Sequence, residues 1–314
     1  MKVLIADKFP DNHIQTLKDA GLEIINEPKA GENDIPNLVK DADFIVVRST
    51  NVNAAAINAG TNLKIVIRAG SGYNNIDVAA ATAKGVSVSN TPGKNSIAVA
   101  ELAMGLIISL DRKIPDNVKD FKNSVWNKAK YSKAEGLYGK TLGIIGVGNI
   151  GKEIAKRAQA FGMKVIGFDV YKSEGIGIEY IDYIEILVSM SDIITLHVPS
   201  NPQTKGMFND KLFGVMKNGA MLINTSRADV IDEDALLRAV KEKGITAGLD
   251  VFKGEPEGKD GAVASKLQNV EGIYVTHHIG ASTEQAQDAV AEETVKIITE
   301  FKKSGKVLNC VNIK

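Results

Sequence analysis

Three side chains in the last third of the sequence could together hold a carboxylate and move a proton. Arg227 carries a planar guanidinium, which can bind a carboxylate through two parallel hydrogen bonds and polarise a neighbouring carbonyl. His278 can take up and return a proton, because an unperturbed imidazole titrates near neutral pH. Glu255 can accept the other imidazole N–H and so stabilise the charged ring. Interconversion of an alcohol and a carbonyl beside a hydride acceptor needs these groups.

Each of the three residues also has a structural alternative. A histidine at a strand end often bonds only to the backbone, and Glu255 could simply be exposed to solvent. Arg227 could pair with Asp229 or Asp232 instead of a substrate. These alternatives are weaker for the three residues together than for any one of them.

A glycine turn within residues 141–172 is the segment that could hold the hydride acceptor. A buried strand is predicted at Leu142–Ile145, and the glycines that follow have the spacing of the dinucleotide fingerprint: Gly146, Gly148 and Gly151. A helix beginning near Asn149 would offer its amide groups to the pyrophosphate, and its apolar face is predicted to hold Ile154, Ala155, Ala158 and Phe161. A second strand, Lys164–Phe168, delivers Asp169 where it can accept ribose hydroxyls. The order of these elements favours a dinucleotide site over a glycine-rich turn in an unrelated α/β protein.

Four more apolar runs follow the fingerprint and complete a predicted six-stranded parallel sheet: Ile193–Leu196, Ala220–Asn224, Thr246–Leu249 and Ile273–Thr276. Each run ends in polar groups, namely His197-Val198-Pro199, Thr225-Ser226-Arg227, Asp250 and His277-His278. The carboxyl ends of parallel strands share one edge, so these groups are predicted to form one site. Adjacent residues on a strand point to opposite faces, so only one of the two histidines should face it.

The first hundred residues form a smaller α/β layer without such a glycine turn. Strands are predicted at Val3–Ala6, Glu23–Asn26, Phe44–Val47, Ile65–Ile67 and Val86–Ser89. Polar loops follow two of them, at residues 48–50 and 69–74, where open α/β sheets place ligands. Arg48 is suited to a carboxylate or phosphate there, although an ion pair within the protein is the alternative.

The remaining segments define the predicted domains. Residues 95–112 form an apolar helix that would cross between two bodies, and residues 113–140 are charged, irregular and contain Trp126. That segment either covers a neighbouring subunit, making a dimer, or is a solvated linker with one packed anchor. An amphipathic helix at Thr283–Lys303 and the tail VLNCVNIK should return to the first layer. We therefore expect a discontinuous substrate domain (1–98 and 283–314) and a cofactor domain (99–282).

Composition excludes several classes of function. The chain has 314 residues, with Lys plus Arg and Asp plus Glu both totalling 38, so its charge favours neither nucleic acid nor a membrane surface. It contains no run of eighteen apolar residues and begins directly with a strand-like KVLIAD, so we expect a cytoplasmic protein. Its single cysteine, Cys310, cannot form an internal disulfide, and the four histidines suggest no metal site beyond the pair at 277 and 278.

These motifs as a set resemble the D-isomer-specific 2-hydroxyacid dehydrogenase family over almost the whole chain, and most closely its phosphoglycerate dehydrogenase branch. The carrying segments are TLGIIGVGNIG, NTSRADVIDEDAL, GLDVFKGEP and THHIGAST, with VRSTNVNAAAI, RAGSGYNNID and TPGKNSIAVAEL in the amino-terminal part. The resemblance implies a Rossmann dinucleotide-binding domain inserted in a flavodoxin-like substrate domain. It also implies NAD as cofactor, a small 2-hydroxy acid as substrate and a homodimer.

The resemblance assigns roles to particular residues. Arg227, Glu255 and His278 would be catalytic, and Arg48, Ser49, Gly72, Asn95 and Arg227 would bind the substrate. NAD would contact Gly146, Gly148, Asn149, Ile150, Gly151, Asp169, His197, Val198, Pro199, Thr225, Asp250, His278 and Gly280. No metal is implied.

The chain departs from the family pattern in places. His277 stands where proline is frequent, which adds a titratable neighbour, and Ala228 stands where glycine commonly follows the catalytic arginine, which restricts the loop. The chain stops at Lys314, so regulation by serine through a further carboxy-terminal domain is not expected. Oxidation of 3-phosphoglycerate is the expected activity, with reduction of glyoxylate or hydroxypyruvate as the rival. Formate dehydrogenase is disfavoured because that branch usually carries glutamine where Glu255 stands, and the alternative of another class is an NAD-sensing binding protein.

Overall fold

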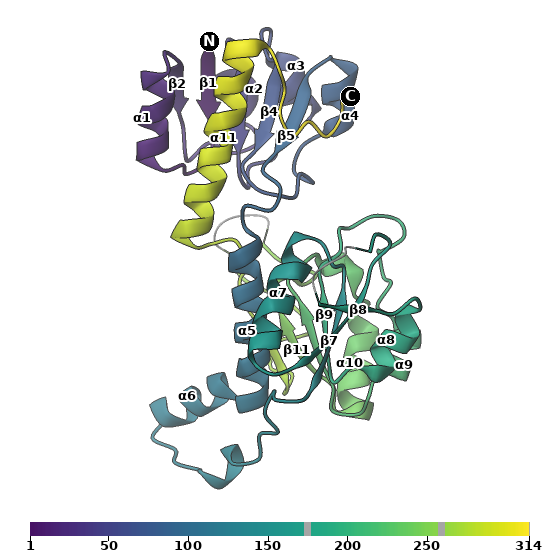
Figure 1. Cartoon of the computed structure of the whole chain (residues 1–314). Coiled ribbons are helices and arrows are strands. Elements are labelled where there is room, and N and C mark those ends of the chain that lie inside the picture. The colour runs from purple at the N-terminus through teal and green to yellow at the C-terminus, as the bar shows by residue number, and fades with distance from the viewer. Residues whose placement is uncertain (173–176, 257–260, 314) are drawn as a thin grey trace. The chain divides into compact units, whose positions relative to one another are not determined.

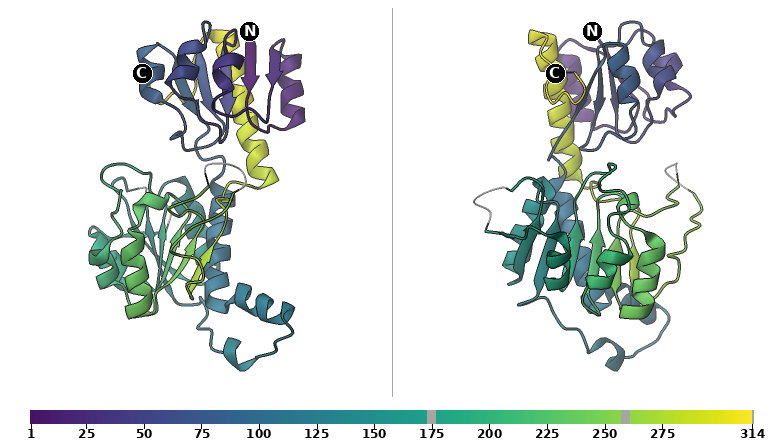
Figure 2. Two further views of the ribbon diagram at one scale, coloured as in Figure 1. Left: turned by 180° about the vertical axis from the view of Figure 1, so that it is seen from behind. Right: turned by 90° about the vertical axis from the view of Figure 1, so that its right-hand side faces the viewer.

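The computed structural model describes residues 1–172, 177–256 and 261–313. The chain divides into two compact units, and we describe each by itself. Unit 1 comprises Met1–Asn95 with Ser282–Lys314, and unit 2 comprises Ser96–Ala281. Each unit is built on a parallel β-sheet with helices on both faces, which confirms the predicted α/β class (Figures 1 and 2).

Unit 1 contains a five-stranded parallel sheet of order β2-β1-β3-β4-β5, which is the order of flavodoxin-like folds. Its strands are β1 (Lys2–Ile5), β2 (Glu23–Asn26), β3 (Phe44–Val47), β4 (Ile65–Arg68) and β5 (Ser87–Asn90). Its helices are α1 (Asp11–Asp19), α2 (Ile35–Leu38), α3 (Ala54–Ala59), α4 (Val78–Ala83) and α11 (Glu284–Ser304). The central strands are apolar runs buried along their length, as expected for a parallel sheet covered on both sides.

The two faces of this sheet have separate cores. Helices α2, α3 and α4 pack on one face, and α1 and α11 pack on the other, where α11 contributes Val290, Ala291, Ile297 and Ile298. The predicted return of the tail is confirmed, because the Val311 amide donates to the Val88 carbonyl at 2.8 Å. Cys310 also forms an isolated antiparallel β-bridge with Ser89 through the backbone. Unit 1 therefore needs both ends of the sequence to complete its core.

Unit 2 contains a seven-stranded parallel sheet of order β12-β11-β10-β9-β6-β7-β8. Its strands are β6 (Thr141–Ile145), β7 (Lys164–Phe168), β8 (Glu179–Tyr180), β9 (Ile193–Leu196), β10 (Met221–Asn224), β11 (Thr246–Leu249) and β12 (Ile273–Val275). Its helices are α5 (Ser96–Arg112), α6 (Ile114–Lys122), α7 (Asn149–Ala160), α8 (Ile184–Met190), α9 (Asp210–Val215) and α10 (Glu233–Lys243), with short 3-10 turns at Ala129–Tyr131 and Ala228–Val230. The strand order reverses beside β6, which is where a doubly wound sheet binds a dinucleotide.

The prediction of six strands was wrong by one, since β8 is also part of the sheet. This strand has only two residues and lies at the sheet edge, so it leaves no apolar run in the sequence. The apolar face predicted for α7 is correct at Ile154, Ala155 and Ala158 but wrong at Phe161. Phe161 is 46% exposed because the helix ends at Ala160.

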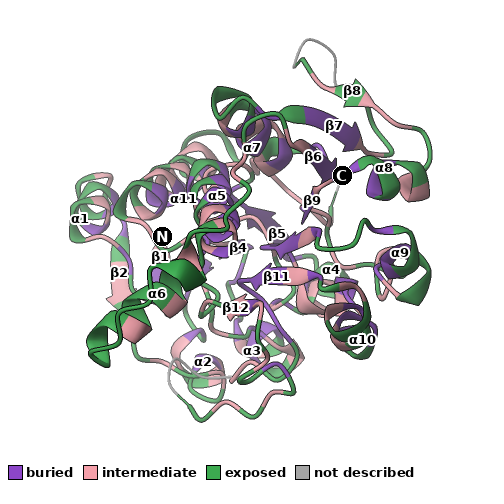
Figure 3. Cartoon of the chain, turned by 90° about the horizontal axis from the view of Figure 1, so that it is seen from below, coloured by how far each residue is buried: buried purple, intermediate pink, exposed green. Residues whose placement is uncertain are grey.

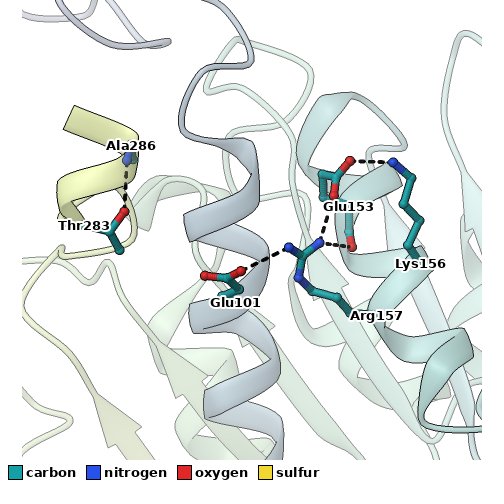
Figure 4. A network of polar contacts seen from close by, with 6 residues as sticks. All are labelled: Glu101, Glu153, Lys156, Arg157, Thr283 and Ala286. Atoms are coloured by element: carbon teal, nitrogen blue, oxygen red, sulfur yellow. Dashed lines mark hydrogen bonds and ion pairs between the residues drawn. The ribbon is translucent and has the colours of Figure 1, made fainter. Parts of the chain in front are cut away.

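The faces of the second sheet are also covered by separate groups of helices. Helices α5 and α7 pack on one face, and α8, α9 and α10 pack on the other. Arg157 of α7 joins this helix to α5 by an ion pair to Glu101 at 3.1 Å, and it also pairs with Glu153 of its own helix at 2.8 Å (Figure 4). Figure 4 also shows Thr283, whose hydroxyl accepts from the Ala286 amide and caps α11 of unit 1. The ion pairs of Arg157 hold α7, the helix that follows the glycine turn, against α5.

The segment at residues 113–140 is not irregular throughout, as the sequence had suggested. It contains α6, in which Ile114, Val118 and Phe121 share helical spacing but none is buried. Figure 3 shows α6 exposed over most of its surface, whereas strands such as β7 and β11 are buried. Trp126 is 82% exposed, which argues against its being a packed anchor in this chain. No helix in the described ranges has the length and apolar character of a membrane span.

Candidate active site

The glycine turn of unit 2 is shaped by close backbone contacts. Gly146 has a φ of +94°, and a side chain there would place Cβ 2.5 Å from the His197 carbonyl oxygen. A Cβ on Gly151 would lie 2.3 Å from the Gly146 carbonyl oxygen, so the start of α7 can approach the turn only with glycine. Gly148 differs, because a Cβ there would meet open space. That space lies before the free amides of α7, which suits a pyrophosphate.

Asp169 is held at the same turn. One carboxylate oxygen accepts the Val147 amide at 2.6 Å and the other accepts the Tyr171 amide at 3.0 Å. A carboxylate has about four acceptor positions, so both oxygens can still accept a ribose hydroxyl. The turn and the acid are thus one preassembled unit.

His197 and Thr225 follow neighbouring strands, β9 and β10, and carry buried polar atoms. The His197 Nε2 lies 2.9 Å from the Thr195 hydroxyl, and burial lowers the pKa of His197 to about 3, which keeps the ring neutral. Within the described ranges, His197 Nδ1 and Thr225 Oγ1 have no hydrogen-bond partner. Buried polar atoms generally require a partner. A bound dinucleotide, which carries hydroxyl, amide and phosphate groups, would supply one, so the residues present fit this cofactor.

Asp250 organises the loop that carries His278. It is 1% exposed, and its carboxylate accepts from the Thr276 hydroxyl at 2.6 Å and from the amides of Ile279 and Gly280 at 2.9 and 2.8 Å. Its backbone carbonyl accepts the His278 amide at 3.0 Å. Its predicted contact with the cofactor remains a prediction, and at most about one acceptor position is left for it.

His278 and Glu255 form the ion pair that the sequence suggested. His278 Nδ1 lies 2.8 Å from Glu255 Oε2, and Glu255 Oε1 accepts the Phe252 amide at 2.9 Å. Burial opposes the charge of Glu255, but hydrogen bonds from His278 and Phe252, with the positive charges of His278 and Arg227, outweigh it and lower the pKa of Glu255. Since Nδ1 is engaged, Nε2 is the nitrogen able to face a substrate.

The prediction that His277 and His278 point to opposite faces assumed that both lie on a strand, and that assumption was wrong. Strand β12 ends at Val275, so neither histidine lies on a strand. His278 has a φ of +50°, a left-handed conformation that a few per cent of non-glycine residues adopt, histidine among the more frequent of them. Strain of this kind concentrates at functional sites. His277 and His278 are both exposed.

Arg227 lies beside this pair. Its Nη1 donates to the Ser226 carbonyl at 2.7 Å, and the Asn224 side-chain amide donates to the Arg227 carbonyl at 2.8 Å, so the loop after β10 is fixed. Burial lowers the pKa of Arg227, while Asp229 and Glu255 act in the opposite direction. The predicted alternative partner Asp232 is instead the N-cap of α10. The carboxyl edge of the sheet thus brings Arg227, Glu255 and His278 together.

Unit 1 has its own cluster of polar loops. Asp7, which is 4% exposed, accepts the amides of Arg48, Ser49 and Thr50 at 2.7, 3.0 and 2.9 Å. The Arg48 guanidinium donates to Ser282 at 3.2 Å. The sequence reading did not single out Asp7, although it directly follows the first strand, where such a carboxylate can order a loop.

A second arginine, Arg68, was also missed. It ends β4 and pairs in register with Val47, the residue before Arg48, so the two arginines occupy neighbouring strand ends. A Cβ on Gly70 would fall 1.4 Å from the Arg68 guanidinium, so glycine makes room for it. The loop that contains Gly72 is closed by Ser71, which donates to predicted Asn95 at 2.7 Å.

Comparison with known proteins agrees with this geometry. Residues 104–280 match the family description "D-isomer specific 2-hydroxyacid dehydrogenase, NAD binding domain". A D-3-phosphoglycerate dehydrogenase of Methanocaldococcus jannaschii is 41% identical over 322 residues, covering 100% of this chain. The chain belongs to the D-isomer-specific 2-hydroxyacid dehydrogenase family. Unit 2 is its NAD-binding domain.

Two further members of the family are similar to this chain over most of its length. A hydroxypyruvate reductase of Thermotoga maritima is 44% identical over 287 residues, covering 90% of this chain and 92% of that protein. The NAD⁺-bound 3-phosphoglycerate dehydrogenase structure of Entamoeba histolytica superposes with a TM-score of 0.84 at 32% identity, covering 100% and 99% of the two chains. This chain spans only 60% of the length of the M. jannaschii relative.

Proposed function

We propose that this protein oxidises D-3-phosphoglycerate to 3-phosphooxypyruvate with NAD, the first step of serine biosynthesis. The observation that carries the proposal is the 2.8 Å contact between His278 and Glu255 beside Arg227, in an NAD-binding domain. A base, a group that supports its charge and a carboxylate-binding cation are what oxidation of a 2-hydroxy acid requires of the protein.

Each residue has a defined part in this reaction. Arg227 binds the substrate carboxylate and draws electron density from C2. His278 Nε2 removes the hydroxyl proton as the C2–H bond breaks and the C2 carbonyl forms, and Glu255 stabilises the resulting imidazolium. Bound NAD would accept the hydride from C2 at its nicotinamide. In the reverse reaction His278 returns the proton to the carbonyl oxygen.

The phosphate of the substrate is assigned to unit 1. Arg48 and Arg68 occupy neighbouring strand ends, and two guanidinium groups suit a phosphate dianion better than the uncharged hydroxyl of an unphosphorylated acid. Ser49, Gly72 and Asn95 border the same loops. Lys128 of a neighbouring subunit is a further candidate for this role.

A second candidate, hydroxypyruvate or glyoxylate reduction, is favoured by the T. maritima relative, of which the alignment covers 92%. A panel of 3-phosphoglycerate, glycerate, lactate and glycolate, with the matching keto acids, separates the two. We expect the highest kcat/KM with 3-phosphoglycerate, and His278→Ala should abolish turnover. Equal rates with glycerate would support the second candidate. Absence of turnover with every compound would support a binding protein instead.

NAD rather than NADP is expected because Asp169 would repel the additional phosphate. The nearby Lys172 does not offset this, since it pairs with Asp182 at 2.5 Å. The ratio of kcat/KM for the two cofactors tests the assignment, and a preference for NADP would reject it.

We also propose that the protein is a homodimer joined through residues 113–140. In that segment Phe121 and Trp126 are 71% and 82% exposed, which is unusual for large aromatic side chains outside an interface.

A further inference from the structure

A buried carboxylate outside the three catalytic residues contacts the loop that carries Glu255. Glu233 is the first residue of α10 and is 8% exposed. Its Oε1 accepts the backbone amide of Lys253 at 2.6 Å, across 20 residues of sequence. A buried carboxylate is unfavourable unless such donors satisfy it, so this contact constrains both partners.

Glu233 is not needed as a helix cap. Asp232 fills that place, and its side chain accepts the amides of Asp234 and Ala235 at 3.0 and 3.2 Å. The Glu233 side chain instead turns to the loop after β11. Its position in the first turn of α10 favours a negative charge there.

The loop that Glu233 holds is a tight turn. The amide of Phe252 donates to Glu255 at 2.9 Å, and Gly254 has a φ of +85°, so the chain reverses between the two residues. Lys253 lies at the outside of this turn and is fixed there by Glu233. Glu255 is thus held from within its loop by Phe252 and, through Lys253, from outside by α10.

We propose that Glu233 is a positioning residue of the active site, which sets the Glu255 carboxylate at the distance where it can support the charge of His278. Glu233 acts through the backbone of Lys253 and touches no reacting atom. The proposal rests on the proposed roles of His278 and Glu255 but not on which 2-hydroxy acid is the substrate.

The test compares three variants assayed with the best substrate of the wild-type protein. Glu233→Ala removes the acceptor, and Glu233→Gln retains a carbonyl oxygen able to accept the Lys253 amide. Asp234→Asn is the matched control. It removes a carboxylate from the same helix turn, where Asp234 is 59% exposed, pairs with Lys266 and, within the described residues, acts on the 251–256 loop only through the charge of Lys253.

We expect Glu233→Ala to lower kcat by up to about tenfold, no more than the loss of the Glu255 charge itself, with little change in the KM for NAD. Glu233→Gln should recover most of kcat, and Asp234→Asn should behave as wild type. Amide hydrogen exchange of the NAD-free protein should be faster in residues 251–255 of Glu233→Ala only.

Two controls separate failure of this inference from failure of the proposed function. If His278→Ala keeps turnover, or Glu255→Gln keeps the full wild-type rate, the assigned site is wrong. If both variants lower the rate while Glu233→Ala keeps its kcat and exchange rates, the positioning role alone is rejected. A Glu233→Ala variant that loses only thermal stability also rejects it.

Discussion

Replacing Glu255 by Gln tests the charge on which the proposed proton transfer depends. The substitution keeps the size of the side chain but removes the negative charge 2.8 Å from His278 Nδ1. A hydrogen bond to a charged group contributes about 1.5–3 kcal/mol. Because the His278 and Glu255 side chains are 58% and 28% exposed, solvent screens the pair, and the lower end of that range applies. About 1.5 kcal/mol corresponds to a change of roughly tenfold in a rate.

The direction of the effect follows from the sign of the lost charge. In the transition state of either direction the His278 ring carries positive charge that Glu255 stabilises, so Glu255→Gln should lower kcat/KM for both oxidation and reduction, by up to about tenfold.

The assay is kcat/KM in both directions, with Asp234→Asn as a surface-carboxylate control. An unchanged kcat/KM in Glu255→Gln would mean that the charge of Glu255 does not support the proton transfer. An equal loss in Asp234→Asn would mean that general electrostatics, and not the ion pair, set the rate. Either result refutes the reasoning.

Three other predictions concern the glycine turn, the buried His197 and the exposed segment at residues 113–140. Gly151→Ala should destabilise the NAD-free protein by about 1–3 kcal/mol, since its Cβ would lie 2.3 Å from a carbonyl oxygen, whereas Gly148→Ala should keep that stability and weaken NAD binding by calorimetry. Burial lowers the pKa of His197 from 6.5 to about 3, so the unfolded chain binds a proton at a higher pH than the folded chain does. The free energy of unfolding therefore decreases as the pH is lowered below 6.5. Wild type should therefore lose about 2–3 kcal/mol more than His197→Asn between about pH 6.5 and 4.5 in urea unfolding; equal losses would contradict this. Trp126→Asp should weaken self-association in sedimentation without changing the stability of the monomer. An unchanged association constant would show that Trp126 is not part of the dimer interface.

Local sequence signals predicted most strands to within one residue. Short apolar runs such as Phe44–Val47 and Ile193–Leu196 are typical of strands buried on both faces of a parallel sheet, and their length favours a strand over a helix. Strand β8 was missed because two residues at a sheet edge carry no such pattern. Helix α6 was missed because its apolar residues cover no core in this chain.

The site was predictable where chemistry and spacing coincide, and not where it depends on distant contacts. Arg227, Glu255 and His278 follow strands that must share an edge. In contrast, Asp7 orders a loop 41 residues away, and Glu233 contacts an amide 20 residues away. The left-handed conformation of His278 accompanies hydrogen bonds from its own amide and those of the next two residues to Asp250, and the weak preference of histidine for this region does not predict it.

The shared core of unit 1 has a consequence for synthesis on the ribosome. Helix α11 supplies Val290 and Ile297 to a core whose strands are made within the first seventy residues. Unit 2, which ends at Ala281, is therefore complete in the nascent chain before unit 1 can close. During that interval α1 alone covers the face of the first sheet that it later shares with α11, and the apolar surface left open beside α1 is where chaperones would be expected to bind.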